Sequence, residues 1–132
     1  MKKILAILVM LSLTACASLD SVVTLIPSFN DSNQSSKIID IRADIERIDC
    51  TQPQLPQAQL IQRDLQWFHL YSESAGIRNS DVIRIIAPME ESVTDWANRS
   101  AKEKPSEVYC NIKKNILKDQ AKSAAKAVLG RF

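Results

Sequence analysis

The chain of 132 residues contains only two glycines and a single histidine, His69. So little glycine leaves few positions for the tight turns of β-hairpins, and no stretch alternates convincingly between polar and apolar residues. No cluster of cysteines and histidines surrounds His69 at the spacing of a metal site. A glycine-rich phosphate loop and a paired nucleophile and base are also missing. These absences argue against a β-rich fold, an enzyme or a cofactor, and they favour a helical binding protein.

The sequence also lacks an apolar run long enough to span a bilayer. The longest run covers residues 4–13, about half of the roughly 20 residues that a transmembrane helix needs. Lys2 and Lys3 precede it, and Leu13, Thr14, Ala15 and Cys16 follow at its end. This order resembles a bacterial lipoprotein signal. The resemblance implies a signal peptide of residues 1–15, cleavage before Cys16, and acyl chains (palmitate among them) on Cys16; the alternative is an ordinary signal peptide in which Cys16 is incidental.

The residues after Cys16 predict the destination. In such lipoproteins an aspartate directly after the acylated cysteine usually retains the protein in the inner membrane, whereas this chain has Ala17 and Ser18. We therefore expect an outer-membrane protein, anchored by lipid at the periplasmic face. Residues 16–36 are predicted to be anchor and polar linker, in which the apolar residues 22–26 rest either against lipid or on the folded domain.

The mature chain has no excess charge of either sign. Loss of Lys2 and Lys3 with the signal leaves 15 basic residues against 15 acidic ones. A formal charge of zero argues against nucleic acid as a partner.

Cysteine is scarce as well, since only Cys50 and Cys110 remain once Cys16 carries lipid. Two thiols in the oxidising periplasm usually pair, so we predict a disulfide. On the chain-entropy model, a loop of this size contributes roughly 4 kcal/mol to stability. Two separately buried thiols are the alternative.

The apolar spacing from residue 37 to residue 132 is helical throughout and predicts an all-α, small four-helix bundle with one disulfide. The first helix is expected from Ser36, as its cap, to Cys50, and the second from Pro56 to Gly76. The third begins at Ser80 and is expected to kink or divide at Pro88. The fourth follows Pro105 and ends at Gly130. Its inward residues are predicted to be Val108, Ile112, Ala121, Ala124 and Val128.

Polar and aromatic side chains on these helices are given structural roles. His69 is expected to be partly packed or exposed rather than catalytic, and the carboxylates of Glu90, Glu91 and Asp95 are expected on a solvent-facing side. Trp67 and Tyr71, four residues apart, are expected in the core; the alternative is that they line a groove for a partner.

The order of these features resembles the pilotins of type II secretion systems, small lipoproteins that escort the secretin. The resemblance covers about residues 38–117 and is carried by residues around the two cysteines: Ile48, Cys50, Leu55, Pro56, Ala58, Lys104, Pro105, Glu107, Cys110 and Asn111. One departure is that a Gly-Trp pair associated with the end of the second helix appears here as Gly76 and Ile77.

The resemblance implies a groove that binds the carboxyl-terminal segment of a secretin as a helix. Lipoprotein carrier machinery would then bring the bound secretin to the outer membrane. From the apolar surplus on two helices, we expect the groove to be lined by Ile38, Ile41, Ile45, Val93 and Trp96. Asp40, Asp44 and Asp95 are expected to steer basic residues of the partner; the alternative is that the whole apolar set is core.

Other envelope roles fit the same sequence. They are a phage- or plasmid-type lipoprotein for exclusion or lysis, and a pilotin of a type III secretion system. A structural tether is disfavoured because the long coiled-coil repeat that it needs is missing.

Overall fold

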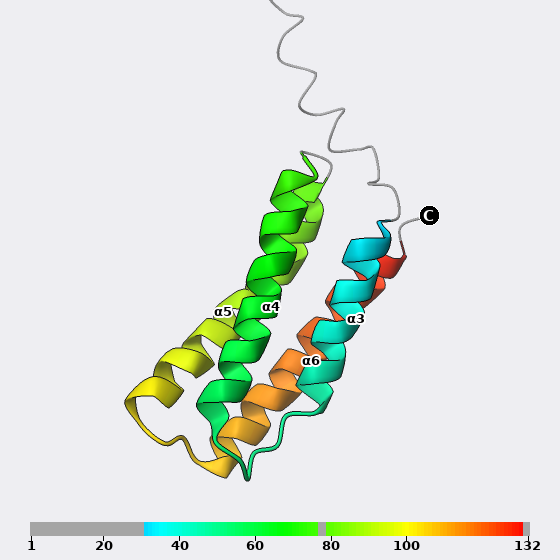
Figure 1. Ribbon diagram of the computed structural model, residues 1–132. Coiled ribbons are helices and arrows are strands. Elements are labelled where there is room, and N and C mark those ends of the chain that lie inside the picture. The colour runs from blue at the N-terminus through cyan, green and yellow to red at the C-terminus, as the bar shows by residue number, and fades with distance from the viewer. Residues whose placement is uncertain (1–30, 77–78, 131–132) are drawn as a thin grey trace, which may run out of the picture.

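Four α-helices make up the part of the chain that the computed structural model describes, residues 31–76 and 79–130 (Figure 1). They are α3 (Ser32–Glu46), α4 (Gln54–Ser74), α5 (Ser80–Lys102) and α6 (Glu107–Leu129). Each helix runs antiparallel to the one before it; α4 packs on α5, α5 on α6, and α3 on both α4 and α6. The helices therefore form a closed ring with α4 opposite α6, and the predicted all-α four-helix bundle is confirmed.

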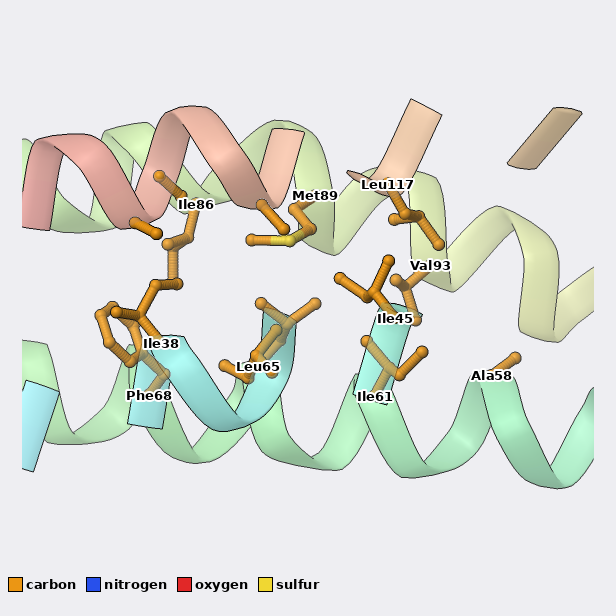
Figure 2. Packing of buried hydrophobic residues seen from close by; sticks show 14 of the residues in the cluster. Ile38, Ile45, Ala58, Ile61, Leu65, Phe68, Ile86, Met89, Val93 and Leu117 are labelled. Atoms are coloured by element: carbon orange, nitrogen blue, oxygen red, sulfur yellow. The ribbon is translucent and has the colours of Figure 1, made fainter. Parts of the chain in front are cut away.

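One apolar face of every helix contributes to a single core. Figure 2 shows Ile38 of α3 meeting Phe68 of α4 and Ile86 of α5, all of them fully buried. The inner face of α6 is built largely from small residues, Ala121, Ala124 and Ala125, together with Leu117 and Val128. Small side chains let α6 approach its neighbours closely, because the distance between packed helices depends on the side chains between them.

Helix α3 begins earlier than its apolar stripe predicts. Asp31 is the N-cap, and its carboxylate accepts hydrogen bonds from the backbone N–H groups of Asn33 (2.8 Å) and Gln34 (3.3 Å). The predicted cap, Ser36, is therefore wrong, and the first turn of α3 lies within the segment predicted as linker. A second polar contact fixes this turn, because the buried Gln34 amide donates to Ser72 Oγ of α4 at 3.0 Å.

The ends of α4 and the middle of α5 show how packing changes the predicted boundaries. Helix α4 starts two residues before Pro56, and the chain leaves it through Gly76, whose φ of +94° is one that glycine adopts without strain. Helix α5 continues through Pro88 without a break, so the division into two helices is wrong. Buried Ile86, Met89 and Val93 on either side of the proline hold the helix against the core and outweigh the roughly 3 kcal/mol that proline costs.

Helix α6 is capped by Ser106, whose hydroxyl accepts the backbone N–H of Tyr109 at 3.1 Å. Its buried face contains Cys110, while Val108 and Ile112 are 70% and 55% exposed. The prediction that these two point inward is wrong. A residue two positions from Cys110 lies about 200° away around a helix, so burial of Cys110 turns both of its apolar neighbours outward.

The disulfide joins Cys50, just beyond α3, to Cys110 in the first turn of α6, with a Cα–Cα distance of 5.6 Å. This confirms the predicted pairing. The link closes the end of the bundle that holds the α3–α4 and α5–α6 connections, opposite the end at which Asp31 enters.

Replacing both bridged cysteines, as in Cys50→Ala with Cys110→Ala, is expected to lower the free energy of unfolding by about 2–5 kcal/mol. The link spans a sequence separation of 60 residues, and opening it returns conformational entropy to the unfolded chain. Urea titration of the protein, followed by circular dichroism, measures the loss. Wild-type protein in a reducing agent should show the same loss; identical unfolding midpoints with and without reductant would contradict this expectation.

Candidate functional site

The five residues predicted to line a groove are instead in the core. Ile38, Ile41, Ile45, Val93 and Trp96 are all 0% exposed. Figure 2 shows Ile38, Ile45 and Val93 inside the bundle, where side chains of the other helices surround them. They offer no surface to a partner, so the predicted groove is corrected: the ring of four helices buries Ile38, Ile41 and Ile45 of α3 in its own core, and of the isoleucines on this helix only Ile39 is exposed.

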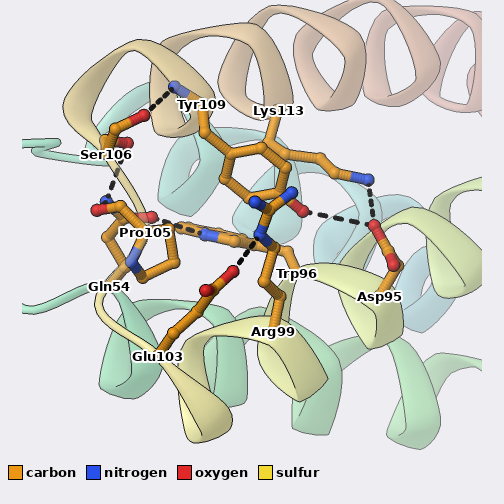
Figure 3. A network of polar contacts seen from close by, with 9 residues as sticks. All are labelled: Gln54, Asp95, Trp96, Arg99, Glu103, Pro105, Ser106, Tyr109 and Lys113. Carbon is orange, nitrogen blue, oxygen red and sulfur yellow. Dashed lines mark hydrogen bonds and ion pairs between the residues drawn. The ribbon is translucent and has the colours of Figure 1, made fainter.

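Trp96 also has a polar role in the interior. Its indole N–H donates to Oε1 of Gln54 at 3.0 Å, and the Gln54 amide donates to the carbonyl of Pro105 at 3.0 Å (Figure 3). Both side chains are buried. This chain of hydrogen bonds joins α5, the start of α4 and the connection before α6, so Trp96 is an element of the closed end rather than a docking residue.

Asp95, predicted to steer a partner, is engaged within the bundle (Figure 3). It accepts hydrogen bonds from Lys113 Nζ at 2.6 Å and from the Tyr109 hydroxyl at 3.2 Å. The hydrogen bond from Lys113 holds the pKa of the Asp95 carboxyl below its usual range. Asp44 is similarly paired, with Arg47 at 2.9 Å. Asp95 therefore links α5 to α6, the Asp44 pair is local to the end of α3, and both carboxylates already have a cationic partner.

Arg99 forms a second contact between α5 and α6, next to that of Asp95. The guanidinium of Arg99 lies 4.3 Å from the centre of the Tyr109 ring and donates to Glu103 at 2.6 Å. The hydrogen bond to Glu103 raises the pKa of Arg99.

The surface of α4 has an apolar face of its own. Leu60, Trp67 and Leu70 are 39%, 43% and 54% exposed, and we call these three residues the α4 face. The Trp67 ring stacks on the Tyr71 ring, with ring centres 5.0 Å apart. The ammonium group of Lys37 lies 5.4 Å from the centre of the Trp67 ring. The expectation that Trp67 is a core residue is wrong.

A hollow of about 430 Å³ lies beside this face, between α4 and α5. Its lining consists of Gln62, Leu65, Gln66, His69, Leu70, Glu73, Glu90 and Thr94. His69 is half-buried between two carboxylates, with Nδ1 2.9 Å from Glu90 and Nε2 3.3 Å from Glu73. An apolar floor from Leu65, an apolar edge from Leu70 and two carboxylates suit a partner that presents an apolar anchor next to a cationic group.

Two other surface features lie elsewhere. Val108, Ile112 and Ile116, which we call the α6 stripe, are 70%, 55% and 41% exposed on the helix opposite α4. A larger hollow of about 960 Å³ lies at the disulfide end, lined by residues 50–55 and 100–107. Gln54 and Pro105, which are joined by a hydrogen bond at the closed end of the bundle, are part of its lining.

Within residues 31–76 and 79–130, no group of three or more histidine, cysteine, aspartate or glutamate side chains is placed to hold a metal ion. In the same residues, no helix combines the length and hydropathy that crossing a membrane requires. The predicted signal peptide, Cys16 and the apolar residues 22–26 lie outside the described residues. Comparison of the chain with family models, curated proteins and solved structures finds no match.

Gln54→Ala is expected to lower the free energy of unfolding by about 1–3 kcal/mol, because it leaves the buried Trp96 N–H and the Pro105 carbonyl without their partner. Urea titration monitored by tryptophan fluorescence measures the change. Gln66→Ala, an exposed glutamine on the same helix, is the matched control and should unfold like the wild type. Equal stability of the two variants would show that the Gln54 bridge contributes nothing.

Proposed function

We propose that this chain is a pilotin: an outer-membrane lipoprotein that binds the carboxyl-terminal segment of a secretin and carries it to the outer membrane for assembly of a type II secretion channel. The sequence supports this through the lipoprotein-like signal and the order of features around the two cysteines. The fold supports it through a disulfide-linked bundle of four helices. No bond of the partner is made or broken in this role.

The main support for a binding role is the α4 face next to the hollow between α4 and α5. Trp67 and Leu70 are large, exposed and three residues apart on the same helix. Aromatic and large aliphatic side chains of this kind supply most of the energy at protein interfaces. An amphipathic helix of the secretin would lie along α4, with apolar anchors on Trp67 and Leu70.

Charge fixes the orientation of that helix. Glu73 and Glu90 border the hollow, and the described residues place only His69 between them. A lysine or arginine one turn from the apolar anchor of the partner would meet these carboxylates. Such a rim contact contributes more to specificity and to the rate of association than to affinity.

The energetics favour a moderate, reversible complex. A disordered secretin tail that folds on binding gives up about 2–5 kcal/mol in ordering. Buried anchors recover that cost, each contributing on the order of 2 kcal/mol where the contact is well packed. Several acyl chains on Cys16, each methylene adding about 0.8 kcal/mol, would make the membrane attachment effectively permanent. The lipid thus supplies transport while the bundle supplies selection.

Trp67→Ala and Leu70→Ser are each expected to weaken binding of a secretin tail peptide by about 1–3 kcal/mol, since each removes an apolar anchor. Fluorescence anisotropy of a labelled peptide, titrated with the mature chain, measures the affinity. The control is Ile39→Ser, which alters an isoleucine on α3 that is 51% exposed, close to the 54% of Leu70. Wild-type affinity in both α4 variants would move the docking surface elsewhere.

Failure of the wild-type chain to bind any secretin tail from the same genome would refute the pilotin proposal itself. Circular dichroism of each variant shows whether the fold is intact, so that a binding defect can be assigned to the surface.

Cys16→Ser is expected to leave an uncleaved or soluble periplasmic protein, because the thiol that would carry the lipid is gone. Ala17→Asp is expected to move the protein from the outer to the inner membrane. Membrane fractionation with mass spectrometry of the amino-terminal peptide follows both changes. Fractionation like that of the wild type in both variants would remove the lipoprotein interpretation.

A further inference from the structure

The α6 stripe is an exposed apolar row on the side of the bundle away from the proposed docking surface. Its three residues, Val108, Ile112 and Ile116, are spaced four apart and therefore form one ridge along the helix. Disulfide formation requires Cys110 to face the core, which keeps this ridge in solvent. The disulfide accounts for the position of the stripe, but neither the core nor the proposed contact with a secretin uses its apolar side chains.

Opposite charges lie at the two ends of the stripe. Lys104 stands just before α6, and Asp119 lies one turn beyond Ile116. Both are exposed, and neither forms an ion pair with another residue in the described part of the chain. By contrast, Lys113 and Lys118 on the same helix are paired, with Asp95 and Glu46. Lys104 and Asp119 thus stand where a partner on the stripe would end, although other exposed charges of α6 also lie outside an ion pair within the described residues, namely Glu107, Lys122 and Lys126.

We propose that the α6 stripe is a homodimer contact, occupied by the same stripe of a second copy in antiparallel orientation. A two-fold axis at Ile112 places Val108 opposite the partner's Ile116, since each lies four residues from the axis. The same axis brings Lys104 toward the partner's Asp119. It also brings Asp119 toward the partner's Lys104, so the dimer contains two such pairs and each charge is paired once. A two-fold interface requires this kind of self-complementary surface.

The antiparallel arrangement is favourable for the helices as well. Asp119 approaches the positive end of the partner's α6, near its first turn, where a carboxylate is stabilised by the helix dipole. Packing of two rows with a four-residue spacing is the commonest way in which helices meet in globular proteins. The α4 face lies on the opposite side of the ring and stays open in such a dimer.

Three side chains form a small contact. Stable interfaces bury about 1,200–2,000 Å² in total, which the stripe with its two charges does not reach. The dimer is therefore a weak, exchanging one, and its test has to capture short-lived pairs in the full chain under native conditions.

The first test uses photo-crosslinking in cells that produce the full chain and lack secretins, so that its outcome does not depend on the proposed function. A benzophenone amino acid replaces Ile112, and the same group at Ile39 is the control. Irradiation should join two copies through the segment around residue 112, identified by mass spectrometry, and should give no such product from position 39. Absence of the homodimer, or adducts with other proteins only, would overturn the proposal.

The second test uses charge reversal in the crosslinking background. Lys104→Glu or Asp119→Lys alone makes both symmetric pairs repulsive and should lower the yield of crosslinked dimer about three- to tenfold. The combined variant restores attraction with reversed polarity and should return the yield to within about twofold of the parent. A combined variant as poor as the single ones would show that Lys104 and Asp119 do not meet, and would overturn the proposed pairing.

Discussion

The disulfide between Cys50 and Cys110 determines the rotation of α6 about its own axis, and much of the surface follows from that rotation. A crosslink to the end of α3 requires Cys110 to face inward. Helical geometry then places Leu117, Ala121, Ala124 and Val128 on the same buried side and sends Val108 and Ile112 to the surface. A single covalent bond thus selects which of two apolar rows on α6 becomes core and which stays available to a partner.

Closure of the ring has a further effect on recognition. With α3 packed against both α4 and α6, its buried isoleucines Ile38, Ile41 and Ile45 are enclosed and offer no groove. The large apolar side chains that the core leaves outside are Ile39 on α3, three residues on α4 and three on α6, and α4 and α6 lie opposite each other in the ring. The bundle therefore has two separate faces of different character: one beside a hollow bordered by carboxylates, the other an uncharged row with an opposite charge at each end.

Periodicity and cysteine counting were sufficient to predict the helices and the disulfide, because both depend on features that recur along the chain. Exact boundaries were not predictable in this way. The start of α3 depends on the Asp31 cap and on the contact between Gln34 and Ser72, two residues 38 apart in sequence. Pro88 continues in a helix because distant side chains hold it there. The burial of the predicted groove residues could not be read from the sequence, because a stripe of isoleucines is the same in sequence whether a fourth helix covers it or not. The exposure of Trp67 could have been predicted, since Trp67 lies off the buried face of α4. That face is formed by Ala58, Ile61, Leu65 and Phe68.

The placement of the disulfide at the end of the bundle opposite Asp31 also has a mechanical meaning. Any pull on the chain ahead of Asp31 enters the fold through the first turn of α3 and loads that helix along its length. The isoleucines of α3 would give way one turn at a time, from the loaded end. Cys50 lies just past the last of these turns and is covalently joined to α6. Unwinding of α3 from that end would therefore stop at Cys50, because from this residue on the load is shared between the backbone leading into α4 and the disulfide to α6.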